Sequence, residues 1–253
     1  MHSVLDRERT IILVKAWPQP SPKYGETVCC AGVTPEGEWR RLFPIRFRHL
    51  AGTAKFNRWD VVEYQPQTPK EDRRRESRHV HEQSIRRVGT LPQKSRADLL
   101  APLVRQSYAE AASAGESLTL IRPSQFSLGW KRKPESKLQA ERAARAKTSA
   151  QGSLLEKELA VLEPCPFEIF VSFTDASGPH RMQCGDWETP ATFFHWRKRY
   201  GDEEALERLK VRYEEDYPAG GVAFAMGTMA KYPKTWMLLG LIRLDDSSQM
   251  KLI

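Results

Sequence analysis

Residues 1–92 contain a succession of short β-strand-like runs separated by glycine and proline turns, and this pattern limits the folds open to the chain. The runs are Thr10–Ala16, Glu26–Thr34, Glu38–Phe43, Arg58–Gln65 and Arg78–Val88. The second and third flank Pro35-Glu36-Gly37, which predicts a hairpin. Strands this short and closely spaced bury their apolar faces by curling into a small bent sheet or barrel.

After residue 92 the composition changes. Gln93–Ala114 has a helical composition with a leucine-rich apolar stripe, and Ser117–Arg122 is a short strand that stops at Pro123. Lys137–Leu162 predicts a long helix whose first half is basic and whose second half is amphipathic.

The last third of the chain alternates strands and helices. The predicted strands are Pro166–Thr174, His180–Asp186, Val222–Met226 and Trp236–Leu244, and the predicted helices are Thr192–Tyr200 and Asp202–Tyr217, separated at Gly201. Trp236–Leu244 is almost continuously apolar, so we expect it to be central and buried.

These patterns predict an α+β fold in three parts. The first, at 1–92, is a β-barrel-like (OB- or SH3-like) N-terminal half. A basic helical segment follows at 93–163, and an α/β C-terminal part occupies 164–253. The two β-rich parts can share one core, because the strand Trp236–Leu244 is too apolar for the edge of a sheet.

Positive charge is concentrated in the middle of the chain. Residues 66–147 carry 18 Lys/Arg against 9 Asp/Glu, whereas residues 148–253 carry 12 against 16. The whole chain has a net charge of +8. A polarised distribution of this kind favours a polyanionic partner, and nucleic acid is the polyanion we expect.

Two segments are the candidate binding sites. The first contains Arg73, Arg74 and Arg75, followed by Arg86, because guanidinium forks suit phosphate. The second begins at Trp130, where an aromatic ring next to basic residues can stack on a base. Its basic members are Lys131, Arg132, Lys133, Arg142 and Arg145, and Trp39 is a further stacking candidate. The alternative for both segments is a solvated surface paired with nearby acids.

A rival hypothesis is a Mg²⁺-dependent nuclease or phosphoryl-transfer enzyme. Asp186 and Glu188 lie two residues apart at a strand end, a spacing that can hold Mg²⁺, with His180 or His195 as the base. The structural alternative has Asp186 capping the next helix. A second rival is a protein–protein adaptor that docks a basic partner on the acidic helix Asp202–Asp216.

Other functional classes find little support in the sequence. It has no run of about 18 apolar residues, and its N-terminus lacks a signal-peptide core, so we expect a cytoplasmic protein without a membrane span. Its four cysteines form no CxxC pair, and we expect no cofactor unless the nuclease alternative holds.

Several short blocks resemble uncharacterised prokaryotic proteins with an OB-like barrel domain of the dual-OB type. They are Cys29-Cys30-Ala31-Gly32-Val33 with Gly37 to Pro44, Asp72-Arg73 with Glu76-Ser77, Asp186-Trp187-Glu188, and Gly227-Thr228 with Trp236. The resemblance implies a barrel-like first half and transfers no catalytic residue. OB-like barrels often bind single strands or RNA, so it agrees with the leading hypothesis of a nucleic-acid-binding protein in DNA or RNA processing or in defence.

Overall fold

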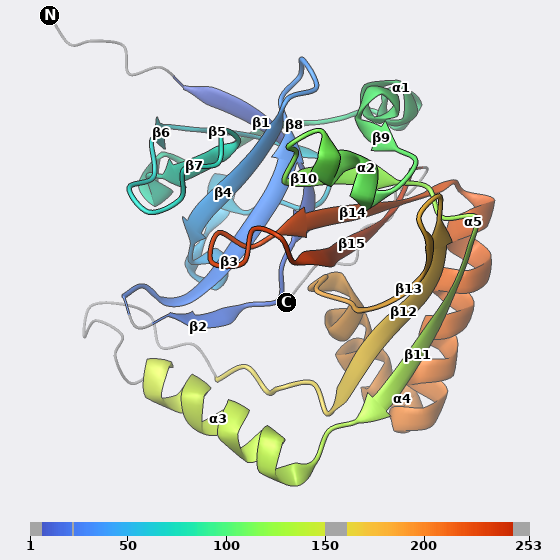
Figure 1. Ribbon diagram of the computed structural model, residues 1–253. Helices are drawn as coiled ribbons and strands as arrows, with labels where there is room; N and C mark the ends of the chain where they lie inside the picture. The colour runs from blue at the N-terminus through green and yellow to red at the C-terminus, as the bar shows by residue number, and fades with distance from the viewer. Residues whose placement is uncertain (1–6, 22, 150–160, 245–253) are drawn as a thin grey trace, which may run out of the picture.

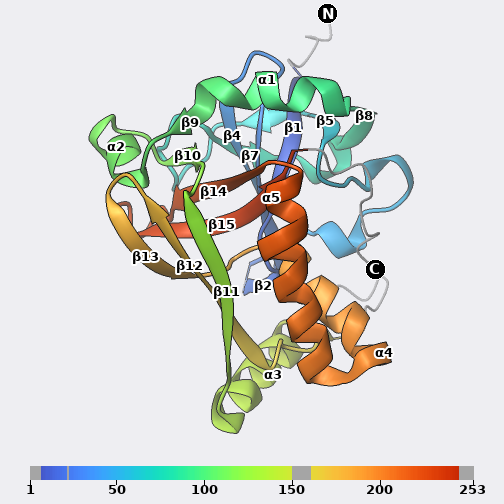
Figure 2. The ribbon, with the colours of Figure 1, turned by 90° about the vertical axis from the view of Figure 1, so that its right-hand side faces the viewer.

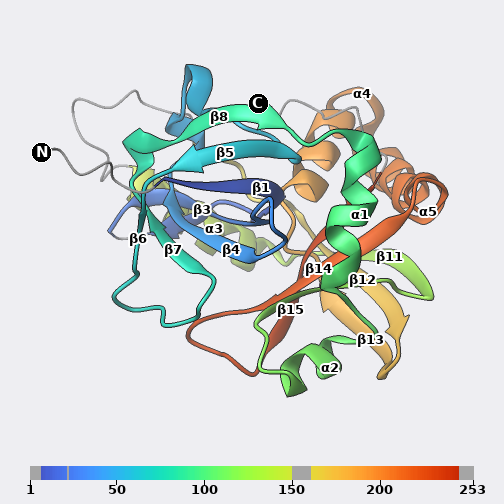
Figure 3. The same cartoon turned by 90° about the horizontal axis from the view of Figure 1, so that it is seen from above.

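The computed structural model describes residues 7–21, 23–149 and 161–244 (Figure 1). Its N-terminal part is an eight-stranded sheet in the order β6-β7-β4-β3-β1-β5-β8, with β2 paired to β3. Seen from above, the sheet curls into a half-barrel (Figure 3). The strands are β1 (Glu8–Lys15), β2 (Gln19–Ser21), β3 (Gly25–Val33), β4 (Trp39–Ile45), β5 (Asp60–Tyr64), β6 (Pro66–Gln67), β7 (Ser77–Val80) and β8 (Arg86–Thr90).

The C-terminal part contains two smaller sheets. One has the order β15-β14-β10-β9 and the other β11-β12-β13. Their strands are β9 (Val104–Arg105), β10 (Leu118–Ile121), β11 (Gln125–Arg132), β12 (Phe167–Asp175), β13 (Gly178–Gln183), β14 (Val222–Thr228) and β15 (Trp236–Arg243).

The helices lie around these sheets. They are α1 (Arg96–Leu100), α2 (Tyr108–Ser113), α3 (Glu135–Ser149), α4 (Glu188–Val211) and α5 (Tyr217–Ala219), with a π-helical turn at Arg212–Asp216. Short 3₁₀ turns occupy Phe47–His49, Gly52–Ala54, Glu82–Ser84, Gln93–Ser95 and Ala101–Leu103. The part of α4 after Gly201, the π-helical turn and α5 form one rod that runs beside β11 (Figure 2). Within the described ranges, no helix is long and apolar enough to cross a membrane.

The apolar core joins the two parts of the chain. On β1, Ile12 packs inside the half-barrel, whereas Ile11 and Leu13 pack with Leu120 of β10 and Ile242 of β15. Strand β1 is therefore buried on both faces.

The main expectations for the fold are confirmed. The protein is α+β with an OB-like curled sheet in its first half, and β3 and β4 form the predicted hairpin. The break at Gly201 is also present, because this residue has φ 80° inside α4, a region that favours glycine.

Several element predictions are wrong or incomplete. Arg78–Val88 is two strands, because the Ser84 hydroxyl donates to the His81 carbonyl and accepts from the Gln65 N–H, which turns the chain between β7 and β8. Strand β15 is buried, yet it lies at the edge of its sheet and not at the centre.

The middle of the chain also differs from the prediction. Gln93–Ala114 forms short helices, since Pro102 lies in the 3₁₀ turn after α1 and Ser107 caps α2. Strand β11 has no counterpart among the predicted elements. The second half of the predicted Lys137–Leu162 helix lies mostly outside the described residues.

Gly32 supplies a test of the packing between β1 and β3. A Cβ on Gly32 would lie 2.1 Å from the Ile11 carbonyl oxygen, whereas a Cβ on Gly89 of the edge strand β8 would meet nothing within 4 Å. We expect Gly32→Ala to lower the free energy of unfolding by about 3 kcal/mol in urea denaturation. Gly89→Ala should change it by less than about 1 kcal/mol, and equal effects would contradict the close approach of the strands.

Candidate nucleic-acid interface

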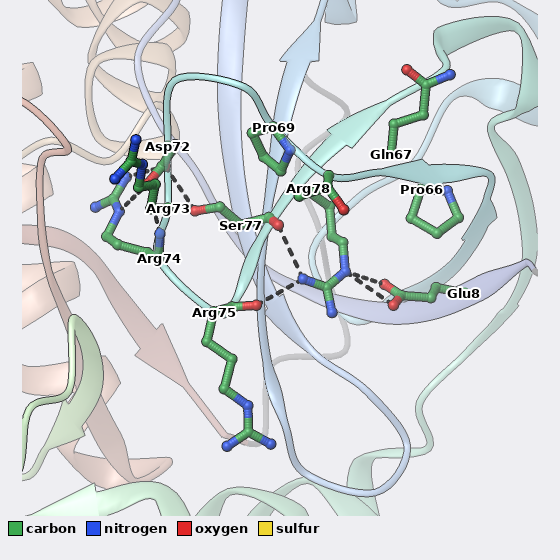
Figure 4. A pocket seen from close by; sticks show the side chains of 11 residues that line it. Glu8, Pro66, Gln67, Pro69, Asp72, Arg73, Arg74, Arg75, Ser77 and Arg78 are labelled. Carbon is green, nitrogen blue, oxygen red and sulfur yellow. Dashed lines mark hydrogen bonds and ion pairs between the residues drawn. The ribbon is translucent and has the colours of Figure 1, made fainter.

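An open pocket of about 420 Å³ lies beside β6 and β7 (Figure 4). It is lined by Glu8, Pro66, Gln67, Thr68, Pro69, Asp72, Arg73, Arg74, Arg75, Ser77 and Arg78. The structure therefore brings the predicted Arg73–Arg75 cluster to one concave surface. Four arginines against two acids give this lining an excess of positive charge.

Asp72 braces the segment that carries these arginines. Its carboxylate accepts hydrogen bonds from the Arg74 Nε at 2.8 Å and from the Ser77 hydroxyl at 2.7 Å. Burial acts to raise the pKa of Asp72, but the hydrogen bonds from Arg74 and Ser77 outweigh it and lower this pKa to about 2. The brace is therefore charged throughout the neutral range.

Arg74 and Arg78 are engaged inside the protein. The Arg74 guanidinium also donates to the Thr228 carbonyl oxygen at 2.5 Å, and Arg78 Nε lies 3.0 Å from both carboxylate oxygens of Glu8. These two arginines position the pocket wall, and their charges are largely balanced. Sequence reasoning missed Glu8, because a pair as distant in the chain as Glu8 with Arg78 leaves no local pattern. The pairing of Arg74 with Asp72, two residues away, agrees with the alternative of arginines paired with nearby acids.

Arg73 and Arg75 remain accessible. Arg75 is 91% exposed, and its nearest acid is Glu38 at 3.6 Å; its side chain points away from Arg78 in Figure 4. Arg73 is exposed and forms no hydrogen bond or ion pair within the described residues. The pocket rim therefore presents two guanidiniums whose charge the protein hardly neutralises.

Two further candidate residues, Arg86 and Trp39, lie elsewhere. Arg86 is exposed on β8, opposite Glu63 in the register of β5 and β8, at the other edge of the sheet from β6. Trp39 is partly buried and packs against the cluster between β1 and the C-terminal strands. Neither lines the pocket.

The second candidate segment is mostly neutralised. Trp130 packs against the C-terminal core. The Arg132 guanidinium lies 3.3 Å from Asp202 and covers the Phe167 ring, and Lys133 pairs with Glu141. Lys131 is the exception, since it is exposed and has no ion pair within the described residues.

Helix α3 uses its arginines for internal contacts. Arg142 pairs with Glu135 and Glu163, both within 3.0 Å. Arg145 is 7% exposed in its side chain; it donates to the Pro18 carbonyl oxygen, and its guanidinium lies over the Trp17 ring. The prediction that Arg145 contacts a ligand is not supported, because this guanidinium attaches α3 to the body of the protein.

The carboxylates of the nuclease alternative lie in a buried ion-pair cluster. Arg58 Nη2 is 2.9 Å from both Asp186 and Glu188, and its Nη1 donates to the Leu241 carbonyl oxygen. Burial raises the pKa of Asp186 to about 6, against the opposing effect of Arg58. A guanidinium thus occupies the position next to both carboxylates that a metal ion would need.

The two histidines do not complete this cluster. His180 Nε2 is 2.9 Å from Asp175 and its Nδ1 is 3.3 Å from the Tyr108 hydroxyl, while His195 is exposed on α4. Among the described residues, no group of three or more His, Cys, Asp or Glu side chains could hold a metal ion. The Mg²⁺ site remains a prediction without a supporting geometry.

Two family models match consecutive parts of the chain. A domain of unknown function (DUF8758) matches residues 6–106, and a second (DUF8757) matches residues 100–252, which is more than half of the chain. The chain belongs to the DUF8757 family. Both descriptions agree with the resemblance, noted in the sequence, to uncharacterised proteins. The prokaryotic origin and the predicted domain boundaries stay predictions.

The chain was also compared with curated proteins and with solved structures. No curated protein matches the sequence. Among solved structures, one described as "Crystal structure of the tetrameric p202 HIN2" is similar with a TM-score of 0.32 and 11% sequence identity, over 92% of this chain and 86% of that chain.

Removing Asp186 tests the buried cluster. Asp186→Ala leaves Arg58 with Glu188 as its only acidic neighbour in the cluster, and we expect the free energy of unfolding to fall by about 3–5 kcal/mol. Glu36→Ala, at an exposed acid in the β3–β4 turn, should change it by less than about 0.5 kcal/mol. Urea denaturation followed by tryptophan fluorescence measures both, and a stable Asp186→Ala variant would contradict the assigned role.

Proposed function

We propose that this protein binds nucleic acid and that Arg73 and Arg75 contact the phosphate backbone. The observation that carries the proposal is the exposure of these two guanidiniums on a segment that Asp72, Arg74 and Ser77 brace. A planar guanidinium suits bidentate contact with phosphate oxygens. Bracing the segment lowers the conformational entropy lost when phosphate binds.

The charge of the whole chain supports the same partner. The net charge of +8 favours association with a polyanion, and residues 66–147 carry the excess. Arg86 and Lys131 are exposed as well and belong to the proposed set as outlying contacts. Arg74, Arg132, Lys133, Arg142 and Arg145 are engaged by acids or carbonyl groups of the protein, so we leave them out of it.

A double substitution at the pocket rim tests the proposal. We expect Arg73→Ala/Arg75→Ala to weaken binding about tenfold in fluorescence anisotropy with labelled single-stranded DNA, duplex DNA and RNA near 0.1 M salt. The slope of log K against log [salt] should become shallower by about 1.4 for single strands, because two phosphate contacts are lost.

A matched control removes two positive charges elsewhere. Lys94 and Arg122 are exposed and lie outside the pocket lining, and we expect Lys94→Ala/Arg122→Ala to keep the affinity within about twofold. Equal losses in both variants would show that only net charge matters. Flat titrations of the unsubstituted protein at low salt would contradict the proposal and favour the adaptor.

A further inference from the structure

The connection between β14 and β15 carries an unusual set of exposed side chains. Every residue from Met229 to Thr235 is exposed, and we call these seven residues the hairpin tip. Tyr232 is 49% exposed and is the one aromatic among the large exposed hydrophobic residues of the described chain. Lys231 and Lys234 flank it, and Lys231 Nζ lies 5.3 Å from the centre of the tyrosine ring.

The hairpin tip has a defined backbone. The Tyr232 N–H donates to the Met229 carbonyl oxygen at 3.1 Å, and the Thr235 N–H donates to the Tyr232 carbonyl oxygen at 3.0 Å. Two successive turns therefore define the course of the backbone at Tyr232, and the side chain of this residue is exposed. An exposed, positioned aromatic ring has no role in the core, and its open face is suited to contact with another flat group.

The tip begins next to the arginine segment. Thr228, the last residue of β14, accepts the hydrogen bond from Arg74, and the Thr228 N–H donates to the Ser117 carbonyl oxygen. Arg41 also donates to that carbonyl oxygen. The hairpin runs beside the β6–β7 region in two perpendicular views (Figures 1 and 3), so the tip and the pocket rim form adjoining parts of one surface.

Charge and chemistry indicate what this surface binds. The exposed cations of the two segments are Lys70, Arg73, Arg75, Lys231 and Lys234, against exposed Glu71 and the neighbouring Glu38. Cations that follow a backbone, together with an aromatic platform for a base, are the combination used for single strands. A duplex hides the faces of its bases, whereas an unpaired strand offers them.

We infer that the hairpin tip and the pocket rim together bind an unpaired nucleic-acid strand, with Tyr232 stacked on a base and Lys231 and Lys234 on phosphates. The inference rests on the proposed function and adds to it the class of nucleic acid and a contact from the C-terminal part of the chain. DNA and RNA strands share the chemistry of base faces and phosphates, and the test includes both.

The test compares Tyr232→Ala with Tyr232→Phe in the full chain. The probes are fluorescein-labelled oligo(dT) and oligo(U) of about 15 nucleotides, a duplex of equal length, and an abasic deoxyribose-phosphate strand. We expect Tyr232→Ala to bind both single strands about 5- to 100-fold more weakly and Tyr232→Phe to bind within about twofold of the unsubstituted protein. The abasic strand should not distinguish the two variants, because it offers no base to stack.

Two further measurements separate stacking from charge. A 2-aminopurine base in the single strand should lose fluorescence on binding to the unsubstituted protein and lose less with Tyr232→Ala. Lys231→Ala/Lys234→Ala should make the single-strand salt slope shallower by about 1.4 while leaving the 2-aminopurine signal at saturation unchanged.

The outcomes distinguish this inference from the proposed function. If Arg73→Ala/Arg75→Ala weakens binding and Tyr232→Ala does not, the inference is wrong and the proposed function stands. Equal losses on duplex and single strands would also overturn it. If the unsubstituted protein binds none of the probes, both fail, and a protein partner for the tip becomes the better account. Thermal unfolding of each variant confirms that the fold is retained.

Discussion

One buried guanidinium joins the two parts of this protein. Arg58 precedes β5 of the half-barrel and contacts Asp186 and Glu188 at the start of α4, together with the Leu241 carbonyl oxygen on β15. Taking three charges out of water is costly, and the cost is offset only while all these partners are present.

Nearby Lys15 depends on the same acids. Burial lowers the pKa of Lys15, and the charge of Glu188 opposes this shift. The Lys15 ammonium also lies 4.9 Å from the centre of the Phe47 ring, a favourable cation–π contact. The cluster therefore fixes how the half-barrel sits against the C-terminal sheets.

A second, less buried connection between the two parts lies beside the proposed nucleic-acid interface. Hydrogen bonds from Arg74 to Thr228 and from Arg41 to Ser117 link the half-barrel to the end of β14 and to the residue before β10. Arg74 and Thr228 are 154 residues apart in the chain, and Arg41 and Ser117 are 76 residues apart. The proposed interface needs both parts, because the guanidiniums come from the first and the aromatic ring from the second.

Local pattern predicts a large part of the fold and a smaller part of the site. The β-branched run at β1 and the hairpin turn at Pro35-Glu36-Gly37 are decided by neighbours in sequence, and both are confirmed. The burial of Arg145 and the edge position of β15 depend on partners distant in the chain, and no local pattern carries them. Charge counting locates the basic segment, yet it does not show which arginines the protein neutralises.

We propose that residues from both parts of the chain contact one ligand together. Hydrogen–deuterium exchange of the unsubstituted protein, with and without a saturating single-stranded oligonucleotide, tests it directly. We expect slower exchange in peptides covering residues 70–78 and 229–235 at the same ligand concentration. Protection confined to residues 131–147, or no protection in either predicted segment, would contradict it.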